Sequence, residues 1–331
     1  MAQGQNPRGN RKRMPKLSGL PAGLLARRML DVKDLRSAAR AKALSFVRAP
    51  QPKVYGRLGD LEVRLAAGRP DILQAQRLRY EVFYEEMSAR PNPVAAMRRL
   101  DQDSYDAICD HLLVVDVSPE PHGPERWAHR RRPRVVGTYR LLRQDVASRS
   151  LGFYTQSEYD IAPLIRAKSP NYRFLELGRS CVLKPYRSKR SVELLWHGLW
   201  TYVREHKVDV MIGCASFEGT DPAAHAMALS YLHHFARAPD GWLCAAHPHL
   251  HQRMNLLPKE QIDLKQALKG LPPLIKGYLR LGAFVGDGAV IDRQFGTTDV
   301  LIILPVEKID PRYFEHFGAP HEVKSRLHLP D

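Results

Sequence analysis

The chain has 331 residues, 44% of them hydrophobic and 26% charged, which is the composition of an ordinary globular protein with a large core. No apolar run reaches the roughly 20 residues of a membrane-spanning helix, and the N-terminus lacks the apolar core of a signal peptide. The four cysteines show no paired spacing, which favours reduced thiols in a cytoplasmic protein.

The net charge of +16 is concentrated near the N-terminus, because residues 1–50 contain twelve Lys or Arg and two Asp. Apolar residues recur there at near-helical spacing among the basic ones, at Leu20, Leu24, Leu25, Met29, Leu30 and Leu35. This pattern is typical of a helix that lies on an anionic lipid surface. Aromatic residues are missing before Phe46, so stacking platforms for single strands are absent, and we expect no specific nucleic-acid partner.

Three parts follow from these patterns. We expect a basic extension at 1–50 that is partly disordered or forms an amphipathic helix, a folded domain at 56–318, and a tail at 319–331. The domain opens with a strand at 61–65, where apolar and polar residues alternate. Pro70 and Asp71 then open a helix whose apolar residues reach Met87.

The remaining elements alternate between strands and helices. Residues 91–105 look irregular, 111–117 reads as a buried strand, and 119–133 is a basic, Pro-rich loop. The strands at 135–142 and 174–183 are expected to pair. A helix through 192–203, a strand at 208–217, a helix capped at Asp221, and strands at 279–285 and 299–306 complete an α/β fold. Its mixed sheet should have helices on both faces.

The strongest candidate site lies in the strand, turn and helix of 174–203. Glu176 stands in an apolar strand, and a turn that is mostly polar or cationic, 184–190, leads into the helix. The free N–H groups and the dipole of a helix N-terminus bind anions such as phosphate. Burial should raise the pKa of Glu176 toward that of a general base. The same carboxylate could instead be structural, held by Arg140 or Arg179.

Six blocks carry a resemblance to a known family: LRYEVFYEEM (78–87), LDQDSYDAICDHLLVVD (100–116), VVGTYRLL (135–142), FLELGRSCVLKPYRS (174–188), GCASFEGTDP (213–222) and KGYLRLGAFVGDGAVIDRQFGTTDV (276–300). They resemble the ornithine acyl-[acyl carrier protein] N-acyltransferases of the GNAT superfamily, which are similar to acyl-homoserine-lactone synthases. The resemblance covers about 60–305 and implies a GNAT-like twisted sheet. The turn at 186–191 lacks the glycines usual in GNAT proteins, which favours an acidic carrier protein over coenzyme A as donor.

The resemblance implies that a 3-hydroxylated acyl chain moves from acyl carrier protein to the α-amine of L-ornithine, giving a lyso-ornithine lipid at the inner membrane. Glu176 would be the base, with Arg179 beside it at the catalytic centre. The N–H groups from Ser180 to Val182 would bind the thioester oxygen. The expected donor contacts are Ser180, Cys181, Val182, Arg187, Ser188, Lys189 and Arg190. No cofactor is expected, because the phosphopantetheine thioester is a co-substrate, and Cys181 is expected to be a core residue rather than a nucleophile.

A diamino acid needs an Arg for its carboxylate and an Asp or Glu for its ammonium group. The candidates are Arg79, Phe83, Asp101, Asp103, Asp292 and Asp299. Other interpretations stay open: an acceptor such as glutamine or glycine, an autoinducer-like synthase, or a basic nucleic-acid-binding protein. The spacing of the histidines at 247, 249 and 251 matches no standard zinc pattern, so no metal site is expected.

Overall fold

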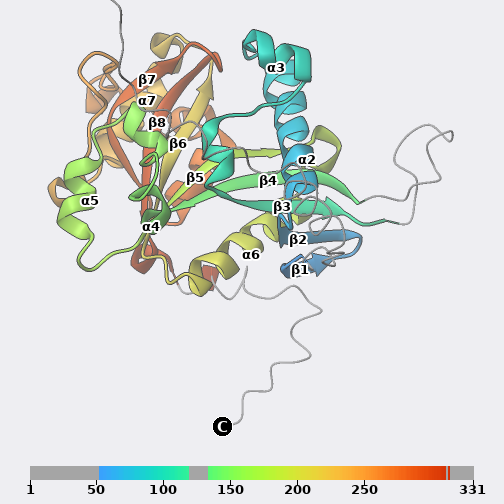
Figure 1. Ribbon diagram of the computed structural model, residues 1–331. Coiled ribbons are helices and arrows are strands. Elements are labelled where there is room, and N and C mark those ends of the chain that lie inside the picture. Colours follow the sequence, from blue (N-terminus) through green and yellow to red (C-terminus); the bar gives the residue numbers. More distant parts are fainter. Residues whose placement is uncertain (1–51, 119–132, 311, 314–331) are drawn as a thin grey trace, which may run out of the picture. The chain divides into compact units, whose positions relative to one another are not determined.

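The computed structural model describes residues 52–118, 133–310 and 312–313. Within them, eight strands form a mixed sheet in the order β1-β2-β3-β4-β5-β6-β8-β7 (Figure 1). Neighbouring strands are antiparallel except for the parallel pair β5 and β6. The strands are β1 (Val54–Leu58), β2 (Leu61–Leu65), β3 (Asp110–Asp116), β4 (Arg134–Arg143), β5 (Phe174–Val182), β6 (Val210–Glu218), β7 (Phe284–Asp292) and β8 (Thr297–Pro305).

The α-helices of this region are α2 (Arg69–Tyr80), α3 (Pro93–Arg98), α4 (Gln144–Ala147), α5 (Ala162–Lys168), α6 (Lys189–Glu205), α7 (Ala226–Phe235), α8 (Leu264–Gly270) and α9 (Pro273–Arg280). The helix α2 continues directly into a π-helix, Glu81–Glu86. Among the described residues, no helix combines the length and the apolar character needed to cross a membrane.

Helices cover both faces of the sheet. The four consecutive residues 112–115 of β3 are all 0% exposed, which requires cover on each face because successive side chains point in opposite directions. On one face α6 approaches closely through Gly198, where an added Cβ would lie 2.4 Å from Val63 and 3.1 Å from Leu112. The helix α2 runs on the other side of β3 and β4 (Figure 1).

The parallel pair β5 and β6 separates after three residues. Phe174, Leu175 and Glu176 pair with the strand segment 210–212, and the two strands diverge beyond them. At the point of divergence, Gly213 lies against Leu177, where a Cβ would meet the carbonyl oxygen at 2.3 Å. The sheet therefore opens beside the second half of β5.

A β-bulge on the other edge of β5 changes the direction of its side chains. Thr138 of β4 pairs with Cys181, and Arg140 pairs with Gly178, so two residues of β5 oppose Tyr139 alone. One of the two, Arg179, has φ of 50°, in the left-handed region that a non-glycine residue rarely adopts. This geometry turns Arg179 out of the regular alternation of the strand.

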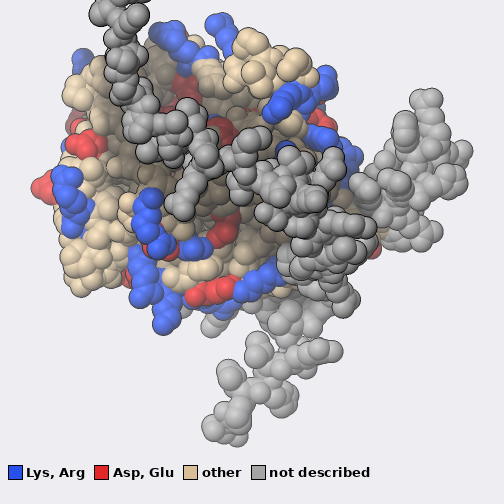
Figure 2. Space-filling model, viewed as in Figure 1, with Lys and Arg blue, Asp and Glu red and all other residues tan. Residues whose placement is uncertain are grey.

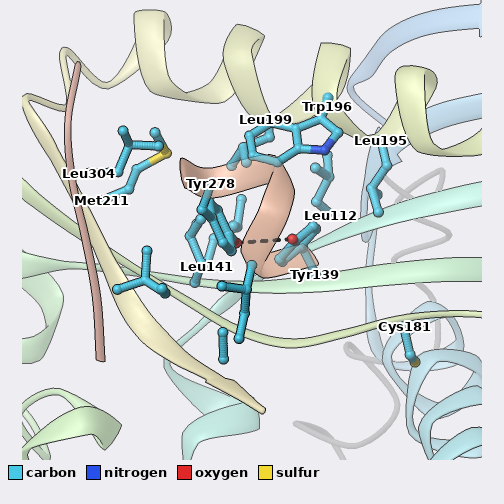
Figure 3. Close-up of a cluster of buried hydrophobic side chains, with 14 of the residues drawn as sticks. Leu112, Tyr139, Leu141, Cys181, Leu195, Trp196, Leu199, Met211, Tyr278 and Leu304 are labelled. Atoms are coloured by element: carbon cyan, nitrogen blue, oxygen red, sulfur yellow. Dashed lines mark hydrogen bonds between the residues drawn. The ribbon is translucent and has the colours of Figure 1, made fainter. Parts of the chain in front are cut away.

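The core beneath this opening is aromatic and aliphatic. Figure 3 shows Trp196 and Leu199 of α6 above the sheet, with Tyr139 of β4 and Tyr278 of α9 facing one another. The hydroxyl groups of the two tyrosines are 3.2 Å apart. This pair joins α9 to the central strands and places it beside the opening of the sheet.

The sequence predicted much of this order correctly, including the strands at 61–65 and 111–117 and the pairing of β4 with β5, which the structure shows to be antiparallel. It missed β1, and the strand expected at 279–285 is wrong, because α9 extends to Arg280 and β7 begins at Phe284. Pro273 at the first turn and the buried Ile275 and Tyr278 explain the helix. Residues 91–105, expected to be irregular, contain α3 and the start of a 3₁₀ turn, Ser104–Ala107.

The predictions for the extension 1–50, for 119–132 of the basic loop and for the tail 319–331 lie outside the described residues. The catalytic domain expected at 56–318 is described from 52 to 313, apart from 119–132 and 311.

Candidate active site

A cavity of about 470 Å³ occupies the opening between β5 and β6. Its walls come from the second half of β5, from Cys214, Ala215 and Ser216 of β6, and from the start of α9. Most of the lining is apolar, and four carboxylates and three guanidinium groups complete it. A concave, mainly apolar cavity with a few convergent charged groups is the usual form of a small-molecule site.

The first carboxylate of the cavity is Glu176, which is 5% exposed. One of its oxygens accepts a hydrogen bond from the N–H of Tyr154 (2.8 Å) and the other from the N–H of Thr155 (2.6 Å). Burial raises the pKa of Glu176, although hydrogen bonds from the side chain and N–H of Thr155 and from the N–H of Tyr154 oppose the shift. The ion pairs of Arg140 and Arg179 go to other carboxylates, so Glu176 is held by the N–H groups of Tyr154 and Thr155 and by the side chain of Thr155.

The guanidinium of Arg179 lies in the cavity wall between two aromatic rings. Its carbon is 5.0 Å from the ring centre of Tyr154 and 4.6 Å from that of Phe295. It also approaches Asp101 at 3.4 Å and Asp103 at 3.3 Å. The rings and carboxylates fix a positive charge at this wall, where the bulge of β5 has directed the side chain.

Three further carboxylates gather on the β6–β8–β7 side of the cavity, and we refer to Glu158, Asp292 and Asp299 as the acidic triad. Their oxygens lie within 4.8 Å of one another. Burial, reinforced by the charge of Asp299, raises the pKa of Glu158 to about 7. Burial also raises the pKa of Asp299 to about 6, although hydrogen bonds from Ser216 and Thr297 oppose it. Asp292 and Asp299 were expected from the sequence, and Glu158 was not.

Arg79, the Arg expected to bind the acceptor carboxylate, is 0% exposed and does not line the cavity. Its Nε lies 2.7 Å from Oδ2 of Asp101, and Nη2 lies 2.9 Å from the carboxylate of Asp106. Asp103 is half-buried and accepts a hydrogen bond of 2.6 Å from Arg140. Phe83, in contrast, does line the cavity. The residues expected at the acceptor site are therefore divided between the cavity and a buried ion network behind it.

The expected donor residues are also divided. Ser180, Cys181, Val182 and Arg187 line the cavity. Burial raises the pKa of the Cys181 thiol to about 12, so the nucleophilic thiolate is scarce at neutral pH. This supports the interpretation of Cys181 as a core residue.

The turn at the cavity mouth is fixed by its own contacts. Arg187 pairs with Glu86 of the π-helix. Ser188 is the N-cap of α6 and accepts a hydrogen bond from the N–H of Ser191 (3.3 Å). Lys189 and Arg190 are exposed at the first turn of α6 and do not line the cavity. The positive charge of this turn therefore lies at and outside the mouth.

Comparisons with known proteins identify the family of the chain. The acetyltransferase (GNAT) domain family matches residues 78–197. An L-ornithine N(alpha)-acyltransferase of Brucella abortus is 53% identical over 86% of this chain and 98% of its own length. The protein of the same name from Rhizobium meliloti is 52% identical over 88% of this chain and 95% of its own.

The chain belongs to the L-ornithine N(alpha)-acyltransferase family. It is an N-acyltransferase with a GNAT domain, which confirms the resemblance found in the sequence and the expected fold class. A more distant member from Rhodobacter capsulatus is 40% identical over 77% of this chain and 94% of its own length. Among solved structures, an N-acyl amino acid synthase from uncultured soil microbes is 11% identical, with a TM-score of 0.40 over 78% of this chain and 93% of that chain.

Membership of the L-ornithine N(alpha)-acyltransferase family does not by itself reveal Glu158. This residue follows a 3₁₀ turn, Tyr154–Ser157, in a segment with neither a motif nor a regular apolar pattern. The only local signal is an acidic residue just before two apolar residues, Tyr159 and Ile161, that are 0% exposed. Its position opposite β7 and β8 depends on contacts more than 130 residues away in the chain, so the sequence could not reveal it.

Proposed function

We propose that the protein transfers an acyl chain from acyl carrier protein to the α-amine of L-ornithine. The observation that carries the proposal is the cavity between the diverging strands, which combines apolar walls with a buried guanidinium and buried carboxylates. An acyl chain is apolar, whereas ornithine has one carboxylate and two amines, so both kinds of surface are needed. The name of the relatives from Brucella abortus and Rhizobium meliloti supports ornithine as the acceptor.

The proposed reaction forms an amide in one attack. The amine nitrogen bonds to the thioester carbonyl carbon, the C–S bond breaks, and the thiolate leaves and takes up a proton. Glu176 lines the cavity, and its raised pKa suits removal of the proton from the attacking amine. Main-chain N–H groups from Ser180 to Val182 are proposed to bind the thioester oxygen as negative charge develops on it.

We propose Arg179 as the partner of the acceptor carboxylate, in place of Arg79. Both are charged and held by carboxylates, but Arg179 lines the cavity and Arg79 does not. A guanidinium fixed between two rings presents its donors in one plane, which matches the two oxygens of a carboxylate.

The acceptor and the donor can be identified in a single assay. The purified protein is incubated with carrier-protein and coenzyme A thioesters of several chain lengths, with and without a 3-hydroxyl group, and with ornithine, glutamine and glycine. Mass spectrometry of the products should show N-acyl-ornithine from the carrier-protein donor. Acylation of glutamine or glycine in preference to ornithine would refute the proposed acceptor, and preference for coenzyme A would refute the proposed donor. No bound cofactor is part of this proposal, because the phosphopantetheine arm arrives with the donor.

The basic turn at the cavity mouth should determine how the donor binds. Carrier proteins are acidic, and basic side chains also gather over α2 and α3 on the face shown in Figure 2. Replacing Arg187, Lys189 and Arg190 by Glu should raise the KM for acyl carrier protein about tenfold or more at low salt, with a smaller effect at high salt, and leave the KM for ornithine nearly unchanged. Charges at the rim of an interface act mainly on association and on its salt dependence.

The control carries the same change of charge away from the cavity, at the exposed Lys259, Lys265 and Lys269. If both triple variants raise the KM equally, the effect is one of net charge and the turn has another use. Titrating carrier protein at two salt concentrations gives the KM of each triple variant at low and at high salt.

We further propose that the protein works at the cytoplasmic face of the inner membrane, through the extension 1–50. Each Lys or Arg near an anionic surface contributes about 1 kcal/mol of binding, and an apolar helix face adds to it. Removing 1–50 should abolish co-flotation with anionic vesicles and leave turnover on soluble substrates within about threefold of the full chain. Neutral vesicles provide the control, since they should bind neither form. Retained flotation with lost turnover would mean that the extension is part of the catalytic fold.

A further inference from the structure

The acidic triad combines close spacing with oxygens that lack hydrogen-bond partners. Glu158 is 8% and Asp299 is 6% exposed, and both line the cavity. Oε2 of Glu158 and Oδ1 of Asp299 accept no hydrogen bond in the part of the chain that the structure describes. Asp292 completes the group at the end of β7.

This arrangement is unfavourable while all three carboxylates are ionised, and either a proton or a bound cation relieves it. Burying a carboxylate without a partner costs several kcal/mol, and neighbouring negative charges increase that cost. Among the described residues, no member of the triad forms an ion pair. Burial is the main cause of the raised pKa values of Glu158 and Asp299, and the neighbouring carboxylates add to both shifts.

The protein nevertheless holds the triad in place. Oδ1 of Asp292 accepts hydrogen bonds from the N–H groups of Gln294 (2.7 Å) and Phe295 (2.9 Å). Asp299 lies within β8, paired on its two sides with Ser216 of β6 and Val290 of β7. A cation would therefore meet carboxylates that are already positioned, at little cost in conformational entropy.

We propose that the acidic triad of Glu158, Asp292 and Asp299 is a subsite for the primary ammonium group at the end of the acceptor side chain. The inference rests on the proposed function. The cavity is proposed to acylate the α-amine of a diamino acid, and the triad is assigned to the second amine, on the side chain. It makes the triad the determinant of specificity for a diamino acid over a neutral amino acid of the same length.

The spacing of the triad is compatible with an ammonium group. An ammonium group donates three hydrogen bonds of about 2.8 Å in roughly tetrahedral directions. Three acceptors in those directions are about 4.6 Å from one another, and the oxygens of the triad lie within 4.8 Å of one another. Carboxylate oxygens are also the ligands that Mg²⁺ prefers, so the experiment includes removal of metal ions.

The position of the triad in the cavity also fits. Arg179 and the triad both line the cavity, and the charge of Arg179 influences both Glu158 and Asp299. A diamino acid can therefore place its carboxylate at Arg179 and its side-chain ammonium at the triad while its α-amine remains at the reacting centre. A neutral side chain in the same place would leave Oε2 of Glu158 and Oδ1 of Asp299 without a donor, which is how polar sites reject analogues that lack the matching group.

The test compares ornithine with norvaline, which has the same carbon chain and no side-chain amine. The wild-type protein should prefer ornithine strongly in kcat/KM. In Glu158→Gln and in Asp299→Asn, the ratio of the two kcat/KM values should fall about 10²-fold, with most of the change in the KM for ornithine. Asp287→Asn removes a half-buried carboxylate of β7 that pairs with Arg237 and does not line the cavity, and it should leave the ratio unchanged. Thermal unfolding confirms that each variant is folded.

Three results would overturn the inference. If a folded variant loses activity on both amino acids equally, the triad serves catalysis or folding rather than side-chain recognition. If EDTA abolishes activity and Mg²⁺ or Mn²⁺ restores it in the wild type but not in the variants, the triad binds a metal ion. An unchanged preference for ornithine in both variants would place the ammonium group elsewhere. A wild-type protein that acylates neither amino acid would instead refute the proposed function, so the two failures are distinct.

Discussion

Replacing Glu176 by Gln is expected to lower kcat by about 10²–10⁴-fold, the usual contribution of a general base. The change keeps the size of the side chain and removes its ability to take a proton. Glu176 lies in the cavity wall, is 5% exposed and has a raised pKa. Steady-state turnover with a saturating acyl donor measures the effect, and binding of the donor itself should persist.

The same carboxylate also accepts the N–H groups of Tyr154 and Thr155, so a structural role must be separated from a catalytic one. The pH profile does this. A base acts only when ionised, so the activity of the wild type should rise with pH through the pKa of Glu176. Thr155→Val removes a side-chain hydrogen bond that lowers this pKa and keeps the carboxylate, so the rising limb should move to higher pH. If the rising limb does not move in Thr155→Val and is still present in Glu176→Gln, it belongs to another titrating group. The role of Glu176 would then be structural, as the acceptor that holds the turn Tyr154–Ser157.

The sequence predicts well those features of the fold that depend on local pattern. The alternation at 61–65, the apolar run at 111–117 and the strand and turn that contain Glu176 are all present in the structure. The strand β1 was missed because Val54–Leu58 is short and only partly buried, so its pattern is weak. The end of α9 was mistaken for the start of a strand because the leucines at 279 and 281 can face the core in either form. The contact of Tyr278 with Tyr139 belongs to the helix, and the sequence does not show it.

The residues of the site also fall into those that local sequence pattern predicts and those that it does not. Glu176 and the residues 180–182 were found because they lie on one strand whose sequence shows both the carboxylate and the turn that follows. Arg79 and Arg179 were both candidates, and no sequence pattern indicates that one is sealed behind the sheet and the other turned into the cavity by a bulge at Tyr139. Glu158 lies beside Asp299 through long-range contacts that local pattern does not determine, such as the hydrogen bond from the hydroxyl of Tyr159 to the carbonyl oxygen of Asp299.

Arg79 lies in the protein interior, so its replacement is expected to have the largest effect on stability. Arg79→Met should lower the free energy of unfolding by about 3–5 kcal/mol at pH 7, because it leaves the buried carboxylates of Asp101 and Asp106 without their main partner. Urea unfolding measures the change. Arg77→Met, an exposed position on the same helix, serves as the control and should change stability by no more than about 0.5 kcal/mol.

The loss in Arg79→Met should depend on pH in a defined direction. Burial alone would raise the pKa of Asp106, but the guanidinium groups of Arg79 and Arg140 hold it below its ordinary value. A carboxylate with a lowered pKa stabilises the fold above its unfolded pKa, and this contribution is lost as the pH falls through the folded pKa. The difference between the wild type and Arg79→Met should therefore be largest near neutral pH and shrink below about pH 4. If stability were unchanged at pH 7 while the KM for ornithine rose, Arg79 would contact the acceptor, as the sequence alone had indicated, and its burial would not persist in the working enzyme.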